Sequence, residues 1–395
     1  MDHALRKTAF RSIVETENIF MSISLSGLLK TVCLIALAFT VCGCRNESSS
    51  MDLKNCPIEH EREFGGIYIK ITIADFLDLG YHFGDCVRLE FSNGYVIEEL
   101  PFYSGYYVPE KEELLVGYPG YPYIKAAINN GDDLWLTAGL KESDTVSITL
   151  VDAGRYGAIQ EARDMQSDDI RENYESDEIF ANFRPIRGGS LKENLIYRAS
   201  SPVDDTYNRA SYADRLSEKN GIRLIVNLSD SEETLADRMD SVSPSEYLQN
   251  LYDQKLILLP GINTQYGSTE LKTRLASVLL EMCSHEGPYL IHCALGKDRT
   301  GFVCALLEML AGASYQEILD DYMLTYHNFY HVTSDGTPAK YQTVVSETFI
   351  PLIHYIVDAD VDLTSADLVP YAEAYLRAGG LSDAQVQFIK NTITK

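Results

Sequence analysis

Residues 289–311 contain a short apolar run, a loop and an apolar helical pattern in immediate succession, and this order constrains the fold more than any other feature. The run 289–292 has the length and composition of a buried strand in a parallel sheet. The same alternating texture surrounds it, with apolar runs at 222–228 and 255–260 and helical patterns at 270–284, 300–311 and 315–327. The second half of the chain is therefore predicted to be an α/β domain with a central, mostly parallel sheet flanked by helices.

The loop between this strand and helix has the chemistry of an anion site. A loop that joins the carboxyl end of a strand to the N-terminus of a helix directs backbone N–H groups and the positive end of the helix dipole at one point. Cys293 opens the loop, so the same field favours its thiolate and makes it a nucleophile. Arg299 follows six positions later, and its planar guanidinium can hold two phosphoryl oxygens. The loop is predicted to bind a phosphate group and to attack it.

The spacing of a cysteine and an arginine is weak evidence without this setting. The segment Cys56–Arg62 has the same spacing, but it lacks the preceding strand, the loop glycine and the following helix. It also places Glu59 and Glu61 where a phosphate would have to bind. We therefore dismiss it as a second site.

The full string from His292 to Gly301 resembles the signature loop of the protein-tyrosine-phosphatase superfamily. It reads His-Cys-Ala-Leu-Gly-Lys-Asp-Arg-Thr-Gly, and its Lys-Asp pair resembles the bacterial secreted branch of tyrosine and dual-specificity phosphatases. The resemblance extends over residues 175–395 through the segments 182–184, 188–189, 195–200, 225–228 and 320–324. It implies a cysteine-phosphatase fold that needs no metal and no organic cofactor.

Carried over to this chain, the resemblance gives each loop residue a role. Cys293 would attack phosphorus to form a cysteinyl-phosphate, Arg299 would bind the transferring group, and Thr300 would stabilise the leaving thiolate. His292 would orient the loop. The substrate would be bound by Ala294, Leu295, Gly296, Lys297 and Gly301. Lys297 suits multiply phosphorylated inositol lipids in the resembled branch, and a solvated surface lysine is the alternative.

The general acid departs from the usual pattern of the superfamily. Most members protonate the leaving oxygen with an aspartate on a separate loop upstream of the cysteine. Here the loop 260–266, which follows the predicted strand 255–260, has no carboxylate. Asp298, inside the phosphate loop, is the candidate that we select, and a structural aspartate at the start of a helix is the alternative reading. Asp230, Glu232 and Glu233 are further candidates.

The N-terminal segment is predicted to be for targeting. Residues 31–43 form an apolar run with the length of a signal-peptide core, and Lys30 supplies the positive flank. The run ends at Val41-Cys42-Gly43-Cys44, which resembles a bacterial lipobox in which Cys44 would become the lipidated first residue. The expected location is the extracytoplasmic face of the cell envelope, with a membrane contact through this lipid. An uncleaved N-terminal anchor is the alternative.

The whole chain divides into five predicted segments. We predict a signal peptide at 1–43, a polar tether at 44–64, a small, mainly β accessory domain at 65–153, an acidic connector at 154–180 and the catalytic domain at 181–395. The accessory domain is rich in tyrosine and glycine, and rings packed across strands are favoured over a sugar- or peptide-binding face. In the connector a solvated acidic face is expected.

Composition limits the partners. The formal charge is −25 at pH 7, the wrong sign for a protein that neutralises nucleic-acid phosphates, so no nucleic acid is expected. No paired Cys or His has the spacing of a metal site.

The expected substrate is a phosphorylated protein or a small phosphomonoester. Two alternatives remain: an inositol-phosphate or phosphoinositide phosphatase, and a catalytically silent phosphate-binding surface protein. The oligomeric state is not fixed by the sequence.

Overall fold

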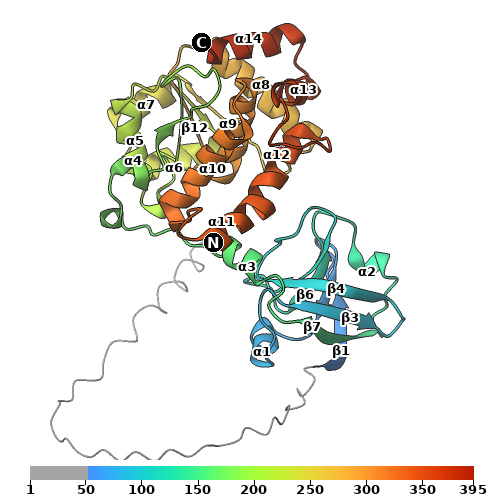
Figure 1. The fold of residues 1–395 in the computed structure, drawn as a ribbon. Coiled ribbons are helices and arrows are strands. Elements are labelled where there is room, and N and C mark those ends of the chain that lie inside the picture. Colours follow the sequence, from blue (N-terminus) through green and yellow to red (C-terminus); the bar gives the residue numbers. More distant parts are fainter. Residues whose placement is uncertain (1–51) are drawn as a thin grey trace, which may run out of the picture. The chain divides into compact units, whose positions relative to one another are not determined.

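The computed structural model describes residues 52–395 (Figure 1). The predicted signal peptide and Cys44 lie outside the described residues. Between residues 52 and 395, no helix is both long enough and apolar enough to cross a membrane.

The N-terminal part of the described chain is a closed barrel of seven strands. Around the barrel the strands follow the order β1-β2-β6-β5-β4-β3-β7, and all pairs are antiparallel except β4 and β5. The strands are β1 (Leu53–His60), β2 (Ile67–Ile69), β3 (Cys86–Phe91), β4 (Val96–Tyr103), β5 (Glu113–Val116), β6 (Ile124–Ile128) and β7 (Thr145–Asp152), with the short helices α1 (Ile73–Asp78) and α2 (Leu134–Thr137) between them. Where a mainly β segment was predicted, the structure has a barrel without a free sheet edge.

One predicted boundary is wrong. The tether was predicted to run to residue 64, but Leu53–His60 forms β1 and pairs with both β2 and β7. Its polar residues hid the strand, because only Cys56 and Ile58 turn fully into the barrel core while most of their neighbours face water. Cys56 and Cys86 are both buried free thiols.

The acidic connector contains helix α3 (Gly157–Arg163), a 3₁₀ turn (Arg171–Asn173) and helix α4 (Asp177–Phe180). Its acidic residues are only partly a solvated face. Asp169 accepts a hydrogen bond from the buried guanidinium of Arg209, which also bonds to the carbonyl oxygen of Phe180. The expectation of a solvated acidic stretch therefore fails at Asp169, because a buried arginine needs a counter-charge.

The C-terminal part is a mixed α/β fold built on a five-stranded sheet. The strand order is β11-β10-β12-β9-β8; the first four are parallel and β8 is antiparallel to β9. The strands are β8 (Arg184–Pro185), β9 (Ile196–Ala199), β10 (Leu224–Asn227), β11 (Ile257–Leu258) and β12 (Tyr289–His292). A mixed α/β fold was predicted, and β12 lies in the middle of the sheet.

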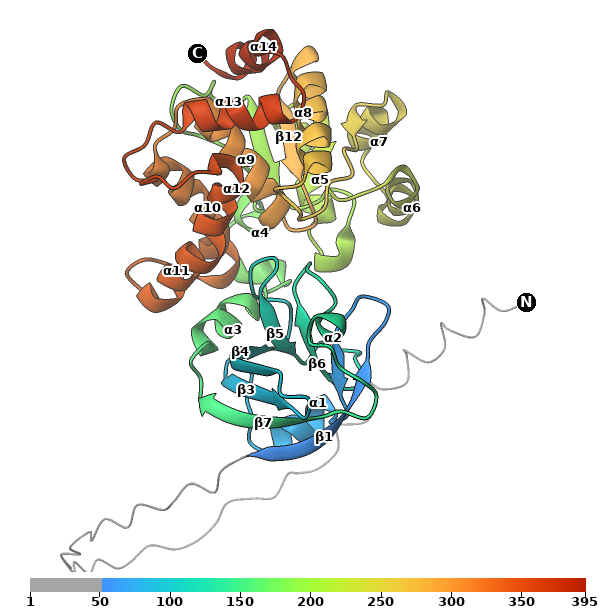
Figure 2. The same cartoon turned by 90° about the vertical axis from the view of Figure 1, so that its right-hand side faces the viewer.

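Helices cover both faces of this sheet (Figure 2). They are α5 (Ala210–Lys219), α6 (Glu232–Val242), α7 (Glu246–Asp253), α8 (Thr269–Ser284), α9 (Asp298–Leu310), α10 (Tyr315–Tyr330), α11 (Pro338–Val344), α12 (Ile350–Val357), α13 (Val369–Ala378) and α14 (Asp383–Ile393), with a π-helical turn at Val345–Phe349. The strand β12 shows why both faces are covered. Tyr289 and Ile291 enter the core beneath α8 and α9, whereas Leu290 enters the opposite core beneath α5, α6 and α7. All four residues of β12 are buried, as in a central parallel strand that is covered on both faces.

Candidate active site

The predicted phosphate loop leaves the centre of the sheet. β12 pairs in parallel with β10 and β9, and His292 lies opposite Asn227 on one side and Ala199 on the other. The loop 293–297 follows directly, and α9 begins at Asp298. The carboxyl ends of three parallel strands and the N-terminus of a buried helix therefore meet at Cys293, which is the geometry of an anion site in an α/β fold.

Gly296 lets the loop lie against the end of β9. Its backbone is left-handed, with a φ of +66°, and a Cβ at this position would stand 2.2 Å from the carbonyl oxygen of Ala199. A side chain is excluded by both the conformation and the space. The loop glycine is therefore required by packing as well as by the turn.

The loop carbonyl groups are held by neighbouring elements. The carbonyl oxygen of Ala294 accepts from the Ser201 amide at 3.0 Å, and that of Leu295 accepts from the Ser200 hydroxyl at 3.4 Å. The carbonyl oxygen of Gly296 accepts from Arg198 Nη2 at 2.8 Å and from Asn182 Nδ2 at 3.2 Å. Peptide units whose carbonyl groups are tied outward present their N–H groups to the inside of the loop.

A buried charge cluster supports the loop from behind. Asp321, on α10, accepts hydrogen bonds from Arg184 Nε at 2.9 Å and from Arg198 Nη1. Burial would raise the pKa of Asp321, but the two guanidinium groups outweigh it and hold the pKa below its ordinary value. Thr325, one turn further along α10, accepts from Asn182 and Arg184. The cluster has two cations for one anion, so it adds positive charge behind the loop.

Cys293 and Arg299 lie at the two ends of this loop. The Cys293 side chain is buried at the end of β12, with 5% of its surface exposed. Arg299 is half-buried and donates a hydrogen bond from Nη1 to the carbonyl oxygen of Leu228 at 3.3 Å. Its guanidinium is thereby held near the carboxyl end of β10. The Thr300 hydroxyl is buried in the first turn of α9 and has no hydrogen-bond partner among residues 52–395.

His292 is a neutral, buried side chain. Burial lowers the pKa of His292 to about 4, so the imidazole carries no charge at neutral pH. Its Nδ1 lies 3.2 Å from the carbonyl oxygen of Cys293. A carbonyl only accepts, so Nδ1 carries the proton and donates. This bond ties the imidazole to the first peptide of the loop.

The candidate general acids differ in their surroundings. Asp298 is in the first turn of α9, and half of its side-chain surface is exposed. Asp230 is buried and already accepts from Arg238 at 2.8 Å and from Asn227 at 2.8 Å. The Asp230 carboxylate is thus already occupied by protein donors, whereas Asp298 is open to solvent. The arrangement favours Asp298 over Asp230.

Lys297 packs against aromatic rings. Its Nζ lies 5.5 Å from the ring centres of both Tyr326 and Tyr330 on α10, and 3.8 Å from the Asp298 carboxylate. Burial acts against the charge, but the Asp298 carboxylate helps to outweigh it and the pKa of Lys297 is raised. The ammonium group therefore remains a cation at the loop. Its charge is partly balanced by the Asp298 carboxylate and the two tyrosine rings.

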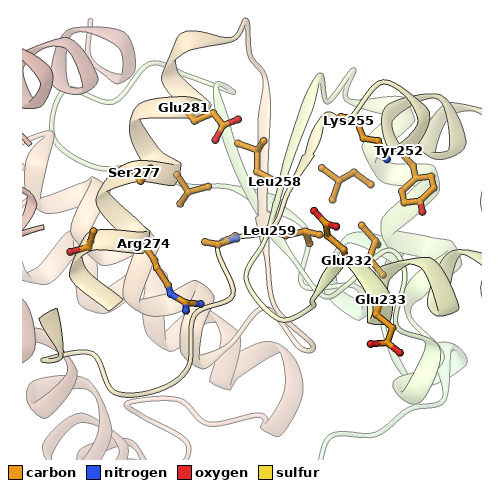
Figure 3. Close-up of a pocket in the computed structure, with 14 residues that line it drawn as sticks. Glu232, Glu233, Tyr252, Lys255, Leu258, Leu259, Arg274, Ser277 and Glu281 are labelled. Carbon is orange, nitrogen blue, oxygen red and sulfur yellow. The ribbon is translucent and has the colours of Figure 1, made fainter. Parts of the chain in front are cut away.

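A hollow of about 1080 Å³ lies beside the edge strand β11, between α6 and α8 (Figure 3). Glu232 and Glu233, two of the candidate acids, line it together with Lys255, Arg274 and Glu281. Cys293 and Arg299 are not among its lining residues. Glu232 and Glu233 therefore line a hollow that neither Cys293 nor Arg299 lines. Within the described part of the chain, no group of three or more His, Cys, Asp or Glu side chains is placed to hold a metal ion.

Sequence reasoning missed the functions of the residues behind the loop. Asn182, Arg198 and Asp321 were noted only as parts of resembling segments, and Thr325 was not noted at all. They are up to 143 positions apart, so no local spacing connects them. The signal that could have raised the question is the polar row Asp321, Thr325 and Asn328, which recurs at helical spacing within the otherwise largely apolar pattern of α10.

The model of the tyrosine phosphatase family matches residues 178–395, which is more than half of the chain. No curated protein matches. Among solved structures, the chain is similar to the core catalytic domain of the PP-IP phosphatase SIW14 from S. cerevisiae in complex with citrate, at 21% identity over 43% of this chain and 93% of that one, with a TM-score of 0.25. A second structure of the Siw14 catalytic core is similar at 19% identity over the same shares, with a TM-score of 0.24.

Proposed function

Because the chain belongs to the tyrosine phosphatase family and is thereby a cysteine-based phosphatase, we propose that it hydrolyses phosphotyrosine in proteins. One observation carries the proposal. The carbonyl groups of Ala294, Leu295 and Gly296 are all tied to neighbouring elements, so a cradle of N–H groups is left between Cys293 and Arg299. Such a cradle is complementary to the equatorial oxygens of a transferring phosphoryl group.

The proposed reaction has two steps. The Cys293 thiolate attacks phosphorus, the bond from phosphorus to the tyrosine oxygen breaks, and Asp298 gives its proton to that oxygen. A water molecule then attacks the cysteinyl-phosphate, Asp298 accepts the proton of the water, and the phosphorus–sulfur bond breaks to release inorganic phosphate. Arg299 holds phosphoryl oxygens in both steps, and the Thr300 hydroxyl donates a hydrogen bond to the departing thiolate.

Charge supports a substrate with one phosphate group at the site. Arg184 and Arg198 are committed to Asp321 behind the loop, and Lys297 is shared with Asp298 and two tyrosine rings. An inositol that carries several phosphates needs several free cations, and the net charge of −25 opposes it further. Lys297 is the observation that favours an inositol phosphate, which is the second candidate.

Steady-state kinetics of the full chain without added metal test the proposal. A phosphotyrosyl peptide, para-nitrophenyl phosphate and inositol hexakisphosphate would be compared for wild type, Cys293→Ser and Asp298→Asn. We expect turnover that vanishes in Cys293→Ser. Asp298→Asn should lose about 10²–10⁴-fold, with the larger loss on the peptide, whose phenol is the poorer leaving group. A higher kcat/KM on the inositol phosphate would favour the second candidate, and no turnover on any substrate would indicate a silent phosphate-binding protein.

We also propose that the protein is exported and lipid-anchored through Cys44. The support is the apolar run 31–43 and the lipobox-like sequence that ends at Cys44. In a bacterial host, the wild-type chain should incorporate a labelled fatty acid and partition with membranes. Cys44→Ala should lose the label, and a variant that keeps it would contradict the anchor.

A further inference from the structure

The loop after β11 has no carboxylate, but it places a tyrosine beside the phosphate loop. Tyr266 ends the segment 260–266, and its side chain is buried with 7% of its surface exposed. Its ring stacks on Phe302 of α9, with ring centres 4.3 Å apart and planes 23° apart. Its carbonyl oxygen accepts a hydrogen bond from the Tyr375 hydroxyl at 2.9 Å. Both the ring and the backbone of Tyr266 are therefore fixed.

The stack on Phe302 places the Tyr266 ring against the N-terminal half of α9. Phe302 comes four residues after Asp298, so the two lie one turn apart on the same face of the helix. The phenol oxygen is within electrostatic reach of Asp298, Cys293 and Arg299, the ionisable groups at both ends of the loop. Burial raises the pKa of Tyr266 well above its ordinary value, so the hydroxyl keeps its proton and is a donor at every working pH.

This donor has no acceptor within the described chain. The Tyr266 hydroxyl oxygen is buried and makes no hydrogen bond with any of residues 52–395. Buried hydroxyl groups in folded proteins are normally paired, because an unpaired one loses its bonds to water and gains none. A buried, fixed and unpaired O–H beside a phosphate cradle therefore needs an acceptor that arrives from outside.

We propose that the Tyr266 hydroxyl donates a hydrogen bond to a phosphoryl oxygen of the bound substrate. The proposal rests on the proposed function, since it concerns the same site. The donor is fixed before the substrate binds, and it acts where negative charge spreads over the phosphoryl oxygens during transfer. Tyr266 keeps its proton throughout, and the leaving oxygen receives its proton from Asp298. In this way the loop 260–266 contributes a neutral donor in place of an acid.

Tyr266→Phe tests this role, with Tyr355→Phe as the matched control. Tyr355 packs against the Tyr266 ring at 5.7 Å, so its variant removes a hydroxyl from the same aromatic cluster. We expect Tyr266→Phe to lower kcat/KM about 100-fold, the size seen when one fixed oxyanion donor is removed. The loss should be equal on para-nitrophenyl phosphate and phenyl phosphate, and Tyr355→Phe should stay within about 2-fold of wild type.

Three results would overturn the proposal. A loss below about 3-fold would mean that the hydroxyl does not contact the phosphoryl group. A loss that is much larger on phenyl phosphate would make Tyr266 the proton donor for the leaving oxygen. A variant that unfolds would show that the hydroxyl has a structural partner in solution, because removal of an unpaired buried hydroxyl should leave Tm unchanged or raised.

Binding of inorganic phosphate separates this proposal from the proposed function. Isothermal titration calorimetry would be run on the full-length wild type, Tyr266→Phe and Tyr355→Phe. If no substrate is turned over, the proposed function fails, and weaker phosphate binding in Tyr266→Phe alone would still support the hydrogen bond. Equal phosphate affinity in all three proteins would refute it, whatever the enzyme acts on.

Discussion

Replacement of Asp321 by asparagine tests whether the buried charge cluster holds the phosphate loop in shape. The Asp321 carboxylate accepts hydrogen bonds from Arg184 and Arg198, and the Arg198 side chain is almost fully buried. Asparagine has nearly the same size, but it is uncharged and turns an N–H₂ group toward one of the guanidinium donors. Two buried cations would then have no counter-charge. Removal of one partner from a buried ion pair costs about 3–5 kcal/mol, so we expect the free energy of unfolding to fall by about 4 kcal/mol.

The pH dependence of this loss identifies its cause. The folded-state pKa of Asp321 is lowered, so its stabilisation is fully present above the unfolded carboxylate pKa of about 4. It is lost as the pH falls below that value through the lowered folded pKa. The stability difference between wild type and Asp321→Asn should therefore be largest at neutral pH and narrow on acidification below about pH 4.

Urea unfolding followed by far-ultraviolet circular dichroism at pH 7 and pH 3 is the assay. Asp320→Asn is the matched control, because Asp320 is the adjacent residue on α10 and is exposed; its change should stay within about 0.5 kcal/mol. Asp321→Asn should also lower kcat/KM, since Arg198 anchors the Gly296 carbonyl. A loss of stability below about 1 kcal/mol, or one that is the same at both pH values, would refute the role assigned to the cluster.

Three further predictions concern other parts of the molecule. Gly296→Ala should lose most activity, because its Cβ would stand 2.2 Å from the Ala199 carbonyl oxygen and the left-handed backbone adds about 1–2 kcal/mol; phosphate binding as tight as wild type would contradict this. The buried His292 has a pKa of about 4, against about 6.5 when unfolded, so the free energy of unfolding should fall by about 3 kcal/mol as the pH drops from 6.5 to 4. Urea unfolding across this range should show a flatter dependence of that free energy on pH in His292→Gln. The same dependence in both proteins would contradict the prediction. In the barrel, Lys125 and Glu61 form a buried ion pair at 2.6 Å, so Lys125→Met should destabilise the barrel by about 3–5 kcal/mol. Unfolding in urea can be followed by the fluorescence of Trp135, the single tryptophan. An unfolding midpoint equal to that of wild type would mean that the ion pair contributes little.

Local sequence signals predicted several elements well. The apolar run and loop at 289–299 lead from β12 into α9 as predicted, with the helix starting two residues before the expected 300. Ser314 with Glu317 and Ser382 with Gln385 have the sequence spacing of a capping box, and both boxes form at the starts of α10 and α14, with side chains and backbone bonded reciprocally. These succeed because each depends on residues within a few positions of one another.

Boundaries in the barrel were harder to predict. A barrel strand has one face toward the core and one toward water, and β1 carries only two fully buried residues in eight. Its pairing with β2 and β7 decides that it is a strand, and β7 is far from it in sequence, since Cys56 pairs with Val146. A strand with few apolar residues and a polar tether have similar sequence patterns, and only pairing with the neighbouring strands distinguishes them.

The sequence by itself determined the strand, loop and helix that bring Cys293, Gly296 and Arg299 together, because these residues lie within seven consecutive positions. Only the tertiary structure decided which charges lie behind the loop and which candidate acid is already occupied. Asn182, Arg198 and Asp321 meet because β9 lies next to β12 and α10 packs against α9. Asp230 is paired with Arg238, and Tyr266 stacks on Phe302 of α9. The physical reason is that burial and pairing of polar groups are properties of neighbours in space, and a sequence shows only neighbours along the chain.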